Sequence, residues 1–511
     1  MVQSAPFFKI DESSESTEFT LGMMLALACL ALSYMLSYLA IHRLHWTFVS
    51  EAAVALLIGI SAGGVLKLIG RTESFQISVF YDVLLPPIIF SSGYSMSRRW
   101  FFANIYKILA FSIIGTCIST ALTGVFLWGL SQTPALTVDL SIKESLAFGS
   151  LISATDPVTT LAIFQELKVE SQLFYVIFGE SVFNDAVAIV LFETLKETLT
   201  GEVISIELAI GKFFFVFLSS MIVGCILGCI SAMIMKYARL RELTVEIVVV
   251  LIFCYFPYLV GQVFSMSGIV AILFTGITMK HYTHRNMSPE AADLSEIAIS
   301  LTASISETFV FLNLGTSVWT MSGVNLSFVC WGILVILIAR AGQVYPLSWI
   351  LNCFERNTRA RLEPKQMHML WYSGLRGAIA YALAVDFPEE SKNHEVIKST
   401  TMMLVLITIL TFGTATVPML KLLGIRRKST GSHNNKSGDD DLESKVHRPD
   451  SALFLKLTPH CKSLLEFDRE YIQPCLVRTL SLIHLLTHFT YLLTYLLTYL
   501  LTQSGTQRTH R

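Results

Sequence analysis

The sequence predicts an all-α protein that crosses a membrane many times, and three features support this fold class. The chain has 511 residues, of which 53% are apolar and 15% are charged, and its mean hydropathy is +0.60. A soluble domain cannot cover its surface with so few polar side chains. The apolar residues form runs long enough to cross a bilayer, and basic residues collect in alternate loops between these runs.

The apolar runs predict about thirteen transmembrane helices, because a helix needs about 20 apolar residues to cross the hydrocarbon core. A count of twelve spans is the alternative, since the ninth run is short. The runs cover residues 21–41, 51–70, 75–95, 107–130, 145–166, 172–193, 208–235, 243–262, 266–280, 297–319, 326–351, 366–387 and 399–423.

The distribution of basic residues gives the expected orientation. The loops that follow even-numbered spans hold few of them: Arg71, Lys143, Lys196, Lys392 and Lys398. The loops that follow odd-numbered spans hold many more: Arg43, Arg98, Arg99, Lys107, Lys168, Lys236, Arg239, Arg241, Lys280, Arg285, Arg356, Arg359, Arg361, Lys365, Arg426, Arg427 and Lys428. Positive charge favours the cytosolic side. The N-terminus is therefore expected outside or in a lumen, and the residues after 423 in the cytosol.

The chain divides into four expected regions. Residues 1–20 are polar and acidic and lack the basic start of a signal peptide, so residues 21–41 are expected to be a span. Residues 21–425 form the transmembrane domain. Residues 426–478 form a polar cytosolic linker with the composition of disordered sequence. Residues 479–511 are Leu-rich and repetitive; they are long enough to span a membrane, but we interpret them as low-complexity sequence without a role.

Span five is expected to be interrupted. It contains the run Thr155-Asp156-Pro157, and proline has no N–H and clashes with the preceding helical turn. An interrupted helix exposes carbonyl groups and helix ends at the middle of a membrane, which is how transporters build ion sites. A simple kink with Asp156 near the surface is the alternative.

Span six carries the polar residues that fit a cation best. Ser181, Asn184 and Asp185 are three and four residues apart, so they share one helical face. A carboxylate, an amide carbonyl and a hydroxyl are oxygen ligands that suit Na⁺. Glu180 points away from this face and is expected to have another partner.

The other charged residues inside spans predict structural ion pairs. Arg376 lies between two glycines in span twelve, Arg340 lies in span eleven and Glu307 in span ten. Arg376 is expected either to compensate the C-terminal end of a half-helix or to pair with Glu180, because an unpaired buried charge is costly. Spans five and twelve are seven apart and have opposite orientations, which predicts two inverted six-helix repeats, spans 1–6 and 8–13.

These residues predict exchange of a cation for a proton. Removing water from a carboxylate disfavours its charged form, so a proton and Na⁺ or K⁺ compete for Asp185 and Asp156. Of the adjacent positions 184 and 185, only 185 is acidic, because position 184 is Asn. A single acidic residue here predicts one proton per cation and electroneutral transport. No glycine-rich phosphate-binding loop is present, which argues against a built-in ATP motor. No cofactor, no enzymatic activity and no nucleic-acid partner are expected.

Several segments together resemble the sodium/hydrogen exchangers of the monovalent cation:proton antiporter superfamily, over about residues 20–425. The segments are 85–90 (LPPIIF), 153–157 (SATDP), 178–187 (FGESVFNDAV), 306–309 (SETF) and 374–378 (GLRGA). Residues 148–153 and 269–289 look most like the Golgi, endosomal and apical branch. The family usually has an acidic residue where Ser91 stands, and Leu or Ile where Phe183 stands.

The resemblance implies a homodimer in the lipid bilayer, in which a six-helix core of each protomer moves like an elevator. It implies that Asp185 carries the exchanged ion, assisted by Asp156, Asn184, Ser181 and Thr155. It also implies that Glu180, Arg340 and Arg376 form ion pairs in the core. A Golgi or endosomal membrane, or the plasma membrane, is the expected location.

Two other functions are compatible with the sequence. A cation channel could use the same acidic residues as a pore, although channels usually repeat a selectivity backbone around a symmetry axis. A proton-coupled carrier of another solute is the second. The choice between Na⁺ and K⁺ stays open at this point.

Overall fold

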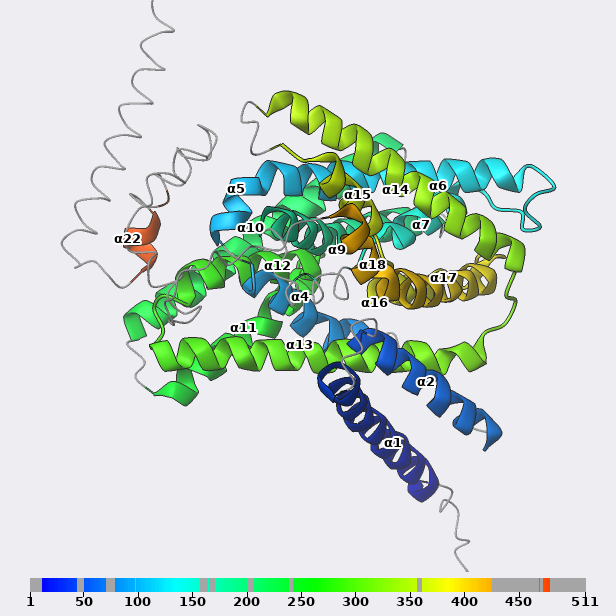
Figure 1. Cartoon of the computed structure of the whole chain (residues 1–511). Coiled ribbons are helices and arrows are strands. Elements are labelled where there is room, and N and C mark those ends of the chain that lie inside the picture. The colour runs from blue at the N-terminus through cyan, green and yellow to red at the C-terminus, as the bar shows by residue number, and fades with distance from the viewer. Residues whose placement is uncertain are drawn as a thin grey trace, which may run out of the picture. The chain divides into compact units, whose positions relative to one another are not determined.

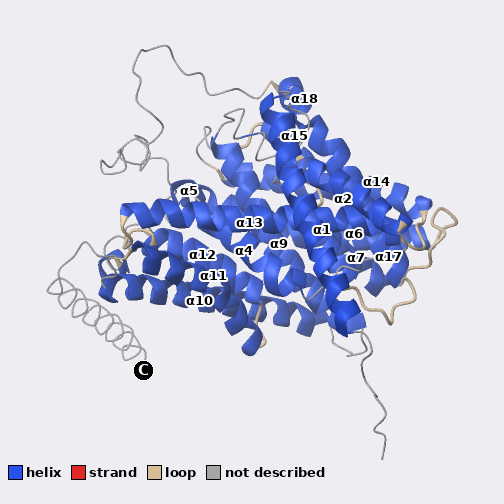
Figure 2. Ribbon diagram, turned by 90° about the horizontal axis from the view of Figure 1, so that it is seen from below, coloured by secondary structure: helices blue, strands red, loops and turns tan. Residues whose placement is uncertain are grey.

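The computed structural model describes residues 12–43, 50–69, 79–96, 98–156, 164, 171–199, 206–238, 242–355, 361–424, 468 and 472–477. These residues are helical or lie in loops, and no strand occurs among them (Figure 2). Pro157, the linker 426–478 apart from the few residues named above, and the Leu-rich segment 479–511 lie outside the described residues.

The described helices overlap every run that the sequence predicts as a span (Figure 1). Eight helical segments are by themselves long and apolar enough to cross a membrane; the count of thirteen crossings stays a prediction. The ends of some helices differ from the predicted ends of the spans, because the helix extends beyond the apolar run. α1 (Glu12–Tyr38) begins within the polar segment 1–20, and α13 (Pro289–Ser317) begins eight residues before the predicted span.

The chain divides into two units, each with its own packing. Unit 1 comprises residues 1–88, 106–214 and 301–429, and unit 2 comprises residues 89–105, 215–300 and 430–511. Several helices continue from one unit into the other: α4 (Leu85–Tyr94), α5 (Arg98–Leu109), α10 (Ile206–Ala238) and α13.

Unit 1 contains the helices of the two spans with interruptions, five and twelve, and the helix that carries the polar residues of span six. Its helices are α1, α2 (Glu51–Leu68), α6 (Thr116–Ser131), α7 (Ile142–Ser153), α9 (Ser171–Leu199), α14 (Leu326–Phe354), α15 (Pro364–Tyr372), α16 (Ala378–Val385), α17 (His394–Thr408) and α18 (Thr414–Leu423). α6 packs along α7 and α14, and α7 packs on α9. Short π-helical turns continue several helices: η1 (Leu39–Arg43), η2 (Phe80–Leu84), η3 (Ala110–Gly115) and η7 (Ile409–Gly413). A 3₁₀ turn, η5 (Val318–Thr320), follows α13.

Unit 2 is built around α10, α11 (Leu243–Val263) and α12 (Gly268–Thr278), which the π-helical turn η4 (Met279–Thr283) continues. α11 packs on α12. The short helix α22 (Gln473–Leu476) belongs to the same unit. Large apolar side chains are exposed along α10 and α11, among them Phe215, Ile222 and Ile226 on α10 and Ile252 and Leu259 on α11.

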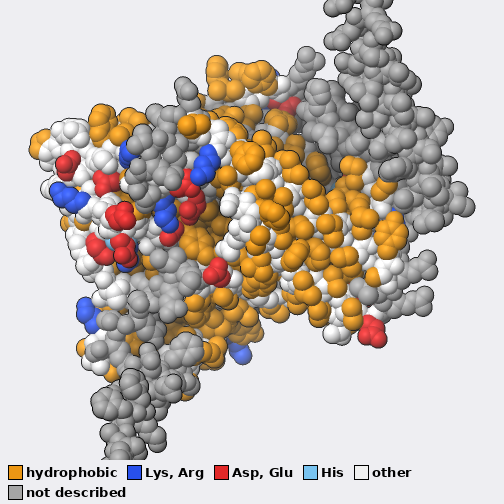
Figure 3. Space-filling view, turned by 180° about the vertical axis from the view of Figure 1, so that it is seen from behind, with side chains coloured by type: hydrophobic (Ala, Val, Ile, Leu, Met, Phe, Trp, Pro, Cys, Tyr) orange, Lys and Arg blue, Asp and Glu red, His pale blue; other side chains and the backbone are white. Residues whose placement is uncertain are grey.

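The surface has the composition of a membrane protein. The face in Figure 3 shows a broad field of hydrophobic side chains, with the Lys, Arg, Asp and Glu side chains gathered mostly at one side of it. Exposed apolar area of this extent is not tolerated in water and is expected where a protein meets lipid or another subunit.

Within unit 1, glycines bring α2 and α13 into backbone contact. A Cβ on Gly59 would overlap the carbonyl oxygen of Leu312, and a Cβ on Gly315 would lie 2.5 Å from the carbonyl oxygen of Leu56. Small residues at such crossings allow helices in membranes to approach closely. The apolar side chains around this crossing are buried against α16 and α17.

We therefore expect Gly315→Ala to destabilise the protein by about 1–3 kcal/mol, because the added methyl group must push the two backbones apart. The measurement is the melting temperature of the purified protein in detergent. Gly129→Ala on α6 is the matched control, since no atom lies within 4 Å of a Cβ at that position. Equal melting temperatures for the two variants would contradict the close approach.

Candidate functional site

The polypeptide leaves helical conformation at two positions that lie against each other in unit 1. α7 ends at Ser153, and residues 154–156 are non-helical; residues 373–377, between α15 and α16, are non-helical as well. The backbone N–H of Asp156 donates to the carbonyl oxygen of Leu375 at 2.8 Å. A backbone hydrogen bond therefore joins the two interruptions, which we call the junction.

Gly377 is required by this close approach. A Cβ on Gly377 would overlap the Cβ and carboxylate of Asp156. A side chain at position 377 would thus displace Asp156 or separate the two segments. Since helix α7 already ends at Ser153, the break precedes Pro157.

α9 braces the open end of α7 through two of the predicted site residues. The Asn184 amide donates to the carbonyl oxygen of Ser153 and to the hydroxyl of Thr155, both at 2.9 Å. The Ser181 hydroxyl donates to the carbonyl oxygen of Thr155 at 2.5 Å. The Thr116 hydroxyl, from α6, donates to the Asn184 amide oxygen at 2.5 Å. Asn184 is thereby fixed by hydrogen bonds on both sides of its amide.

Arg376 lies at the C-terminal end of α7. One of its terminal nitrogens donates to the carbonyl oxygens of Ser153 at 3.0 Å and Ala154 at 3.3 Å, and the residue is 1% exposed. A cation at this end compensates the unpaired carbonyls and the helix dipole. Of the two partners considered for Arg376, the described residues show hydrogen bonds with the half-helix end and none with Glu180.

Glu180 pairs with Arg340 instead. The two terminal nitrogens of Arg340 donate to the Glu180 carboxylate at 2.5 and 2.8 Å, and both residues are buried. Arg340 also donates to the carbonyl oxygen of Leu370 at 3.1 Å, and Gln343 donates to that of Phe111 at 3.2 Å. This bidentate pair connects α9, α14 and α15.

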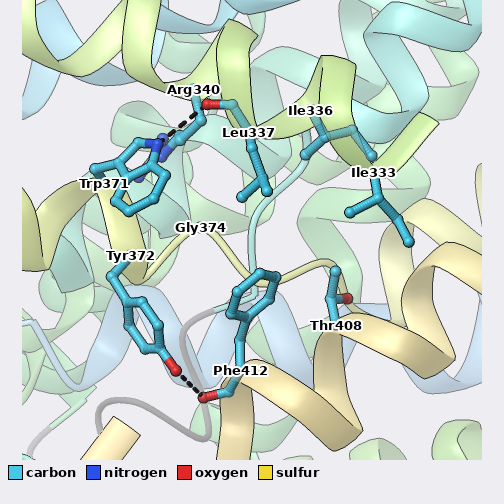
Figure 4. A pocket seen from close by; sticks show the side chains of 9 residues that line it. All are labelled: Ile333, Ile336, Leu337, Arg340, Trp371, Tyr372, Gly374, Thr408 and Phe412. Carbon is cyan, nitrogen blue, oxygen red and sulfur yellow. Dashed lines mark hydrogen bonds between the residues drawn. The ribbon is translucent and has the colours of Figure 1, made fainter. Parts of the chain in front are cut away.

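A small cavity of about 20 Å³ lies beside this pair (Figure 4). Trp371 donates to the carbonyl oxygen of Leu337 at 3.1 Å on one side of it, and Tyr372 donates to that of Phe412 at 2.7 Å on the other (Figure 4). The Nε of Arg340 is buried without a hydrogen-bond partner in the described part of the chain. The cavity has room for about one water molecule, and neither Asp156 nor Asp185 lines it.

Asp185 differs from the adjacent residue, Asn184, in its hydrogen bonds. Its carboxylate accepts no hydrogen bond from the described residues, and the charges that act on it are those of Asp156, Glu180 and Arg376. Both Asp185 and Asp156 are half-buried. Two carboxylates and one arginine act on the Asp185 carboxylate, so a cation or a proton there would offset negative charge. The residues present therefore fit a monovalent cation held by oxygen ligands.

The structural ion pair expected of Glu307 stays a prediction, since no ion pair of Glu307 with Lys or Arg occurs among the described residues. The charges closest to it electrostatically are the carboxylates of Asp156 and Glu51. The sequence could not show this, because a carboxylate in a span predicts a partner but does not specify one.

Sequence reasoning missed several residues that hold the site: Thr116, Ser153, Gln343 and Thr408. A signal for Thr116 was present, since the fourth span carries buried hydroxyl residues at helical spacing: Ser112, Thr116, Ser119, Thr120 and Thr123. Thr408 accepts a hydrogen bond from the backbone N–H of Arg376 at 3.4 Å.

The comparisons with known proteins fit this arrangement. The family model for the transmembrane sodium/hydrogen exchanger matches residues 27–422. The chain belongs to the sodium/hydrogen exchanger family. The family predicted from the motifs is therefore confirmed, and the protein is a transporter rather than an enzyme.

Relatives from animals and plants are similar to this exchanger over most of its length. Sodium/hydrogen exchanger 8 of Rattus norvegicus is 37% identical over 92% of this chain and 86% of its own length. Sodium/hydrogen exchanger 8 of Homo sapiens is 36% identical over 92% and 85%. Sodium/hydrogen exchanger 5 of Arabidopsis thaliana is 37% identical over 84% of each chain.

Among solved structures, the fold is similar to that of the sodium proton antiporter MjNhaP1 from Methanocaldococcus jannaschii. One structure of it gives a TM-score of 0.58 at 17% identity, covering 81% of this chain and 99% of that one. A second, at pH 8, gives 0.55 at 18% identity, covering 79% and 99%. At this identity the likeness shows the fold.

The Glu180–Arg340 pair generates a prediction about folding. Arg340→Met should lower the yield of folded exchanger strongly, since breaking a buried pair from one side costs about 3–5 kcal/mol. The double variant Glu180→Leu with Arg340→Met should recover part of the yield, because no uncompensated charge remains. Size-exclusion chromatography of fluorescently tagged protein measures this. A double variant that folds worse than Arg340→Met would contradict a purely structural pair.

Proposed function

We propose that the exchanger carries out electroneutral exchange of Na⁺, or K⁺, for H⁺ by alternating access, with Asp185 and Asp156 as the groups that bind either ion. The observation that carries the proposal is the contrast on α9: Asn184 is fully hydrogen-bonded to the junction, whereas the Asp185 carboxylate has no hydrogen-bond donor among the described residues. Asp185 is thus the group of this face that remains open to an exchangeable ion.

The roles of the other site residues follow from their contacts. Thr155 and Ser181 offer further oxygen atoms next to Asp156, and Asn184 holds their geometry. Glu180 with Arg340 is a structural pair, and Arg376 compensates the end of α7. One exchangeable charge at positions 184 and 185 supports one proton per cation.

An elevator-like movement is supported by the connectivity of the site. Hydrogen bonds link α6, α7, α9 and the segment between α15 and α16. These elements can therefore move as one rigid body that carries both carboxylates. The two helix interruptions, in spans five and twelve, also support the proposed pair of inverted repeats.

The proposed topology has independent support in unit 2. The tail residues Leu476 and Cys475 contact Asn286 and Lys236, which follow or end predicted spans nine and seven. The tail follows predicted span thirteen. All three spans are odd-numbered, so the expected orientation puts all three segments on the cytosolic side. A homodimer and a Golgi, endosomal or plasma membrane location are further parts of the proposal and rest on the family resemblance.

Replacing the central carboxylate tests the proposal. Asp185→Asn should abolish cation-dependent proton flux in proteoliposomes, because the amide cannot take up a proton or neutralise a cation. Flux is measured with Na⁺, K⁺ and Li⁺ in turn. Asp293→Asn, at an exposed position on α13, is the control with the same chemical change and should keep wild-type flux. Retained flux in Asp185→Asn, or a current that flows without a counter-ion, would refute the exchange mechanism.

Glu307 gives a separate prediction. Among the described residues, no Lys or Arg side chain forms an ion pair with Glu307. Glu307→Gln should therefore fold with a melting temperature close to that of the wild type. The exchange rate should change, because the charge removed acts on Asp156. Melting curves and proteoliposome flux on the same preparation distinguish the two effects. A large loss of folded protein would instead indicate a structural partner.

A further inference from the structure

A short tail segment, residues 468 and 472–477, lies against the ends of α10 and η4 within unit 2. Leu476 and Val477 are buried with Ala232 and Tyr282 in a small apolar cluster. Because Leu476 and Val477 lie near the end of the polar linker 426–478, this contact brings a distant part of the chain back to the membrane domain.

Polar side chains of unit 2 capture the backbone of this tail segment. The Asn286 amide donates to the carbonyl oxygens of Ala232 at 2.9 Å and Leu476 at 2.7 Å. The Lys236 ammonium donates to the carbonyl oxygen of Cys475 at 2.8 Å. Asn286 thus bridges α10 and the tail, and such buried hydrogen bonds fix the register of the segment.

The Asp468 carboxylate provides the charged contact. One of its oxygens lies 3.0 Å from Nε2 of His281 and 2.8 Å from the amide nitrogen of Gln473. The other accepts a hydrogen bond from the Tyr282 hydroxyl. The side chains of His281 and Asp468 are 9% and 12% exposed, so water screens the contact only weakly.

The remaining charges near His281 come from several elements. Lys236 on α10, Lys280 on η4 and Arg285 after it are cations, and Glu296 on α13 neutralises Lys280 at 2.8 Å. The ring of His281 packs on Tyr282 and on Phe102 of α5. Burial, together with the Lys280 charge, lowers the pKa of His284 to about 4, so His284 stays neutral at physiological pH.

We propose that residues 468 and 472–477 belong to a docking segment whose attachment to unit 2 tightens when His281 takes up a proton, so that the segment senses the pH on its own side of the membrane. A protonated imidazole donates a charge-assisted hydrogen bond to the Asp468 carboxylate, which is stronger than the bond from a neutral ring. The docked state therefore binds the proton more tightly than the undocked state, and docking strengthens as pH falls.

Docking that strengthens as pH falls from 8 to 6 is attributed to His281 rather than to Asp468. Burial raises the pKa of Asp468, but hydrogen bonds from His281, Tyr282 and Gln473 outweigh burial and hold that pKa well below its usual range. A carboxyl with a lowered pKa contributes stability above its ordinary pKa of ~3.9 and loses it only in stronger acid. Asp468 therefore stays ionised between pH 6 and 8, which leaves His281 as the titratable partner in this described contact.

Hydrogen exchange of the full-length protein tests docking without requiring transport. The Val477 N–H donates to the carbonyl oxygen of Gln473 and reports on the docked segment. After correction for the intrinsic rate, protection of residues 472–477 should rise at least about threefold from pH 8 to pH 6. Asp468→Asn should reduce protection at least about tenfold and remove its pH dependence.

Two further variants complete this experiment. His281→Gln keeps a donor that cannot be protonated, so protection should persist but become independent of pH. Glu290→Gln, the control, removes an exposed carboxylate at the start of α13 and should leave protection and its pH response unchanged. Unchanged exchange rates in peptides of α9 and α14 show that the variants are folded. Wild-type protection that is equal at pH 8 and pH 6, or unaffected by Asp468→Asn, would overturn the proposal.

A second measurement tests the effect on transport and rests on the proposed exchange function. In proteoliposomes, the pH of half-maximal exchange on the tail side should shift by at least about 0.3 units in His281→Gln and in the same direction in Asp468→Asn, and stay unchanged in the control Glu290→Gln. The tail would not control the pH dependence of transport if the hydrogen-exchange results were as predicted but the pH of half-maximal ion exchange were unchanged in both His281→Gln and Asp468→Asn. If the wild-type protein exchanged no cation for protons in proteoliposomes, the proposed function itself would be refuted.

Discussion

The hydrogen bond between the Asp156 N–H and the Leu375 carbonyl is the contact on which the rest of unit 1 depends. It joins two interrupted helices at the point where each exposes unpaired backbone groups. In a membrane such groups must be satisfied by protein, and here Asn184, Ser181 and Arg376 satisfy those at the end of α7. The closeness of the two segments leaves room only for glycine at position 377.

The charges around the junction divide into two kinds. Glu180 and Arg340 are buried and matched by a bidentate contact, and Arg376 is matched by carbonyl oxygens, so these groups gain nothing from an ion. Asp185 and Asp156 are less buried, and the charges that act on Asp185 are two carboxylates, Asp156 and Glu180, and one arginine, Arg376. In the proposed mechanism, fixed pairs keep the geometry rigid, while the negative charge at Asp185 favours binding of a cation or a proton.

The sequence predicted those features that depend on spacing within one helix. Ser181 and Asn184 lie on one face because a helix repeats every 3.6 residues, and both reach the end of α7. It could not predict partners far apart in the chain: Glu180 had two candidate arginines, and only packing selects Arg340. Glu307 shows the same limit, since its surroundings are set by α2 and the junction rather than by its neighbours in sequence. Thr116 was missed because a hydroxyl in an apolar run usually bonds to its own helix.

The central claim is that one carboxylate of α9 binds either a proton or a cation. Difference infrared spectroscopy of the purified exchanger tests it directly, by following the carbonyl stretch of a protonated carboxyl group while Na⁺ is added at constant pH. The account predicts that wild-type protein loses this band on addition of Na⁺ and that Asp185→Asn lacks the change. A band that does not respond to Na⁺, or that responds equally in Asp185→Asn, would contradict it.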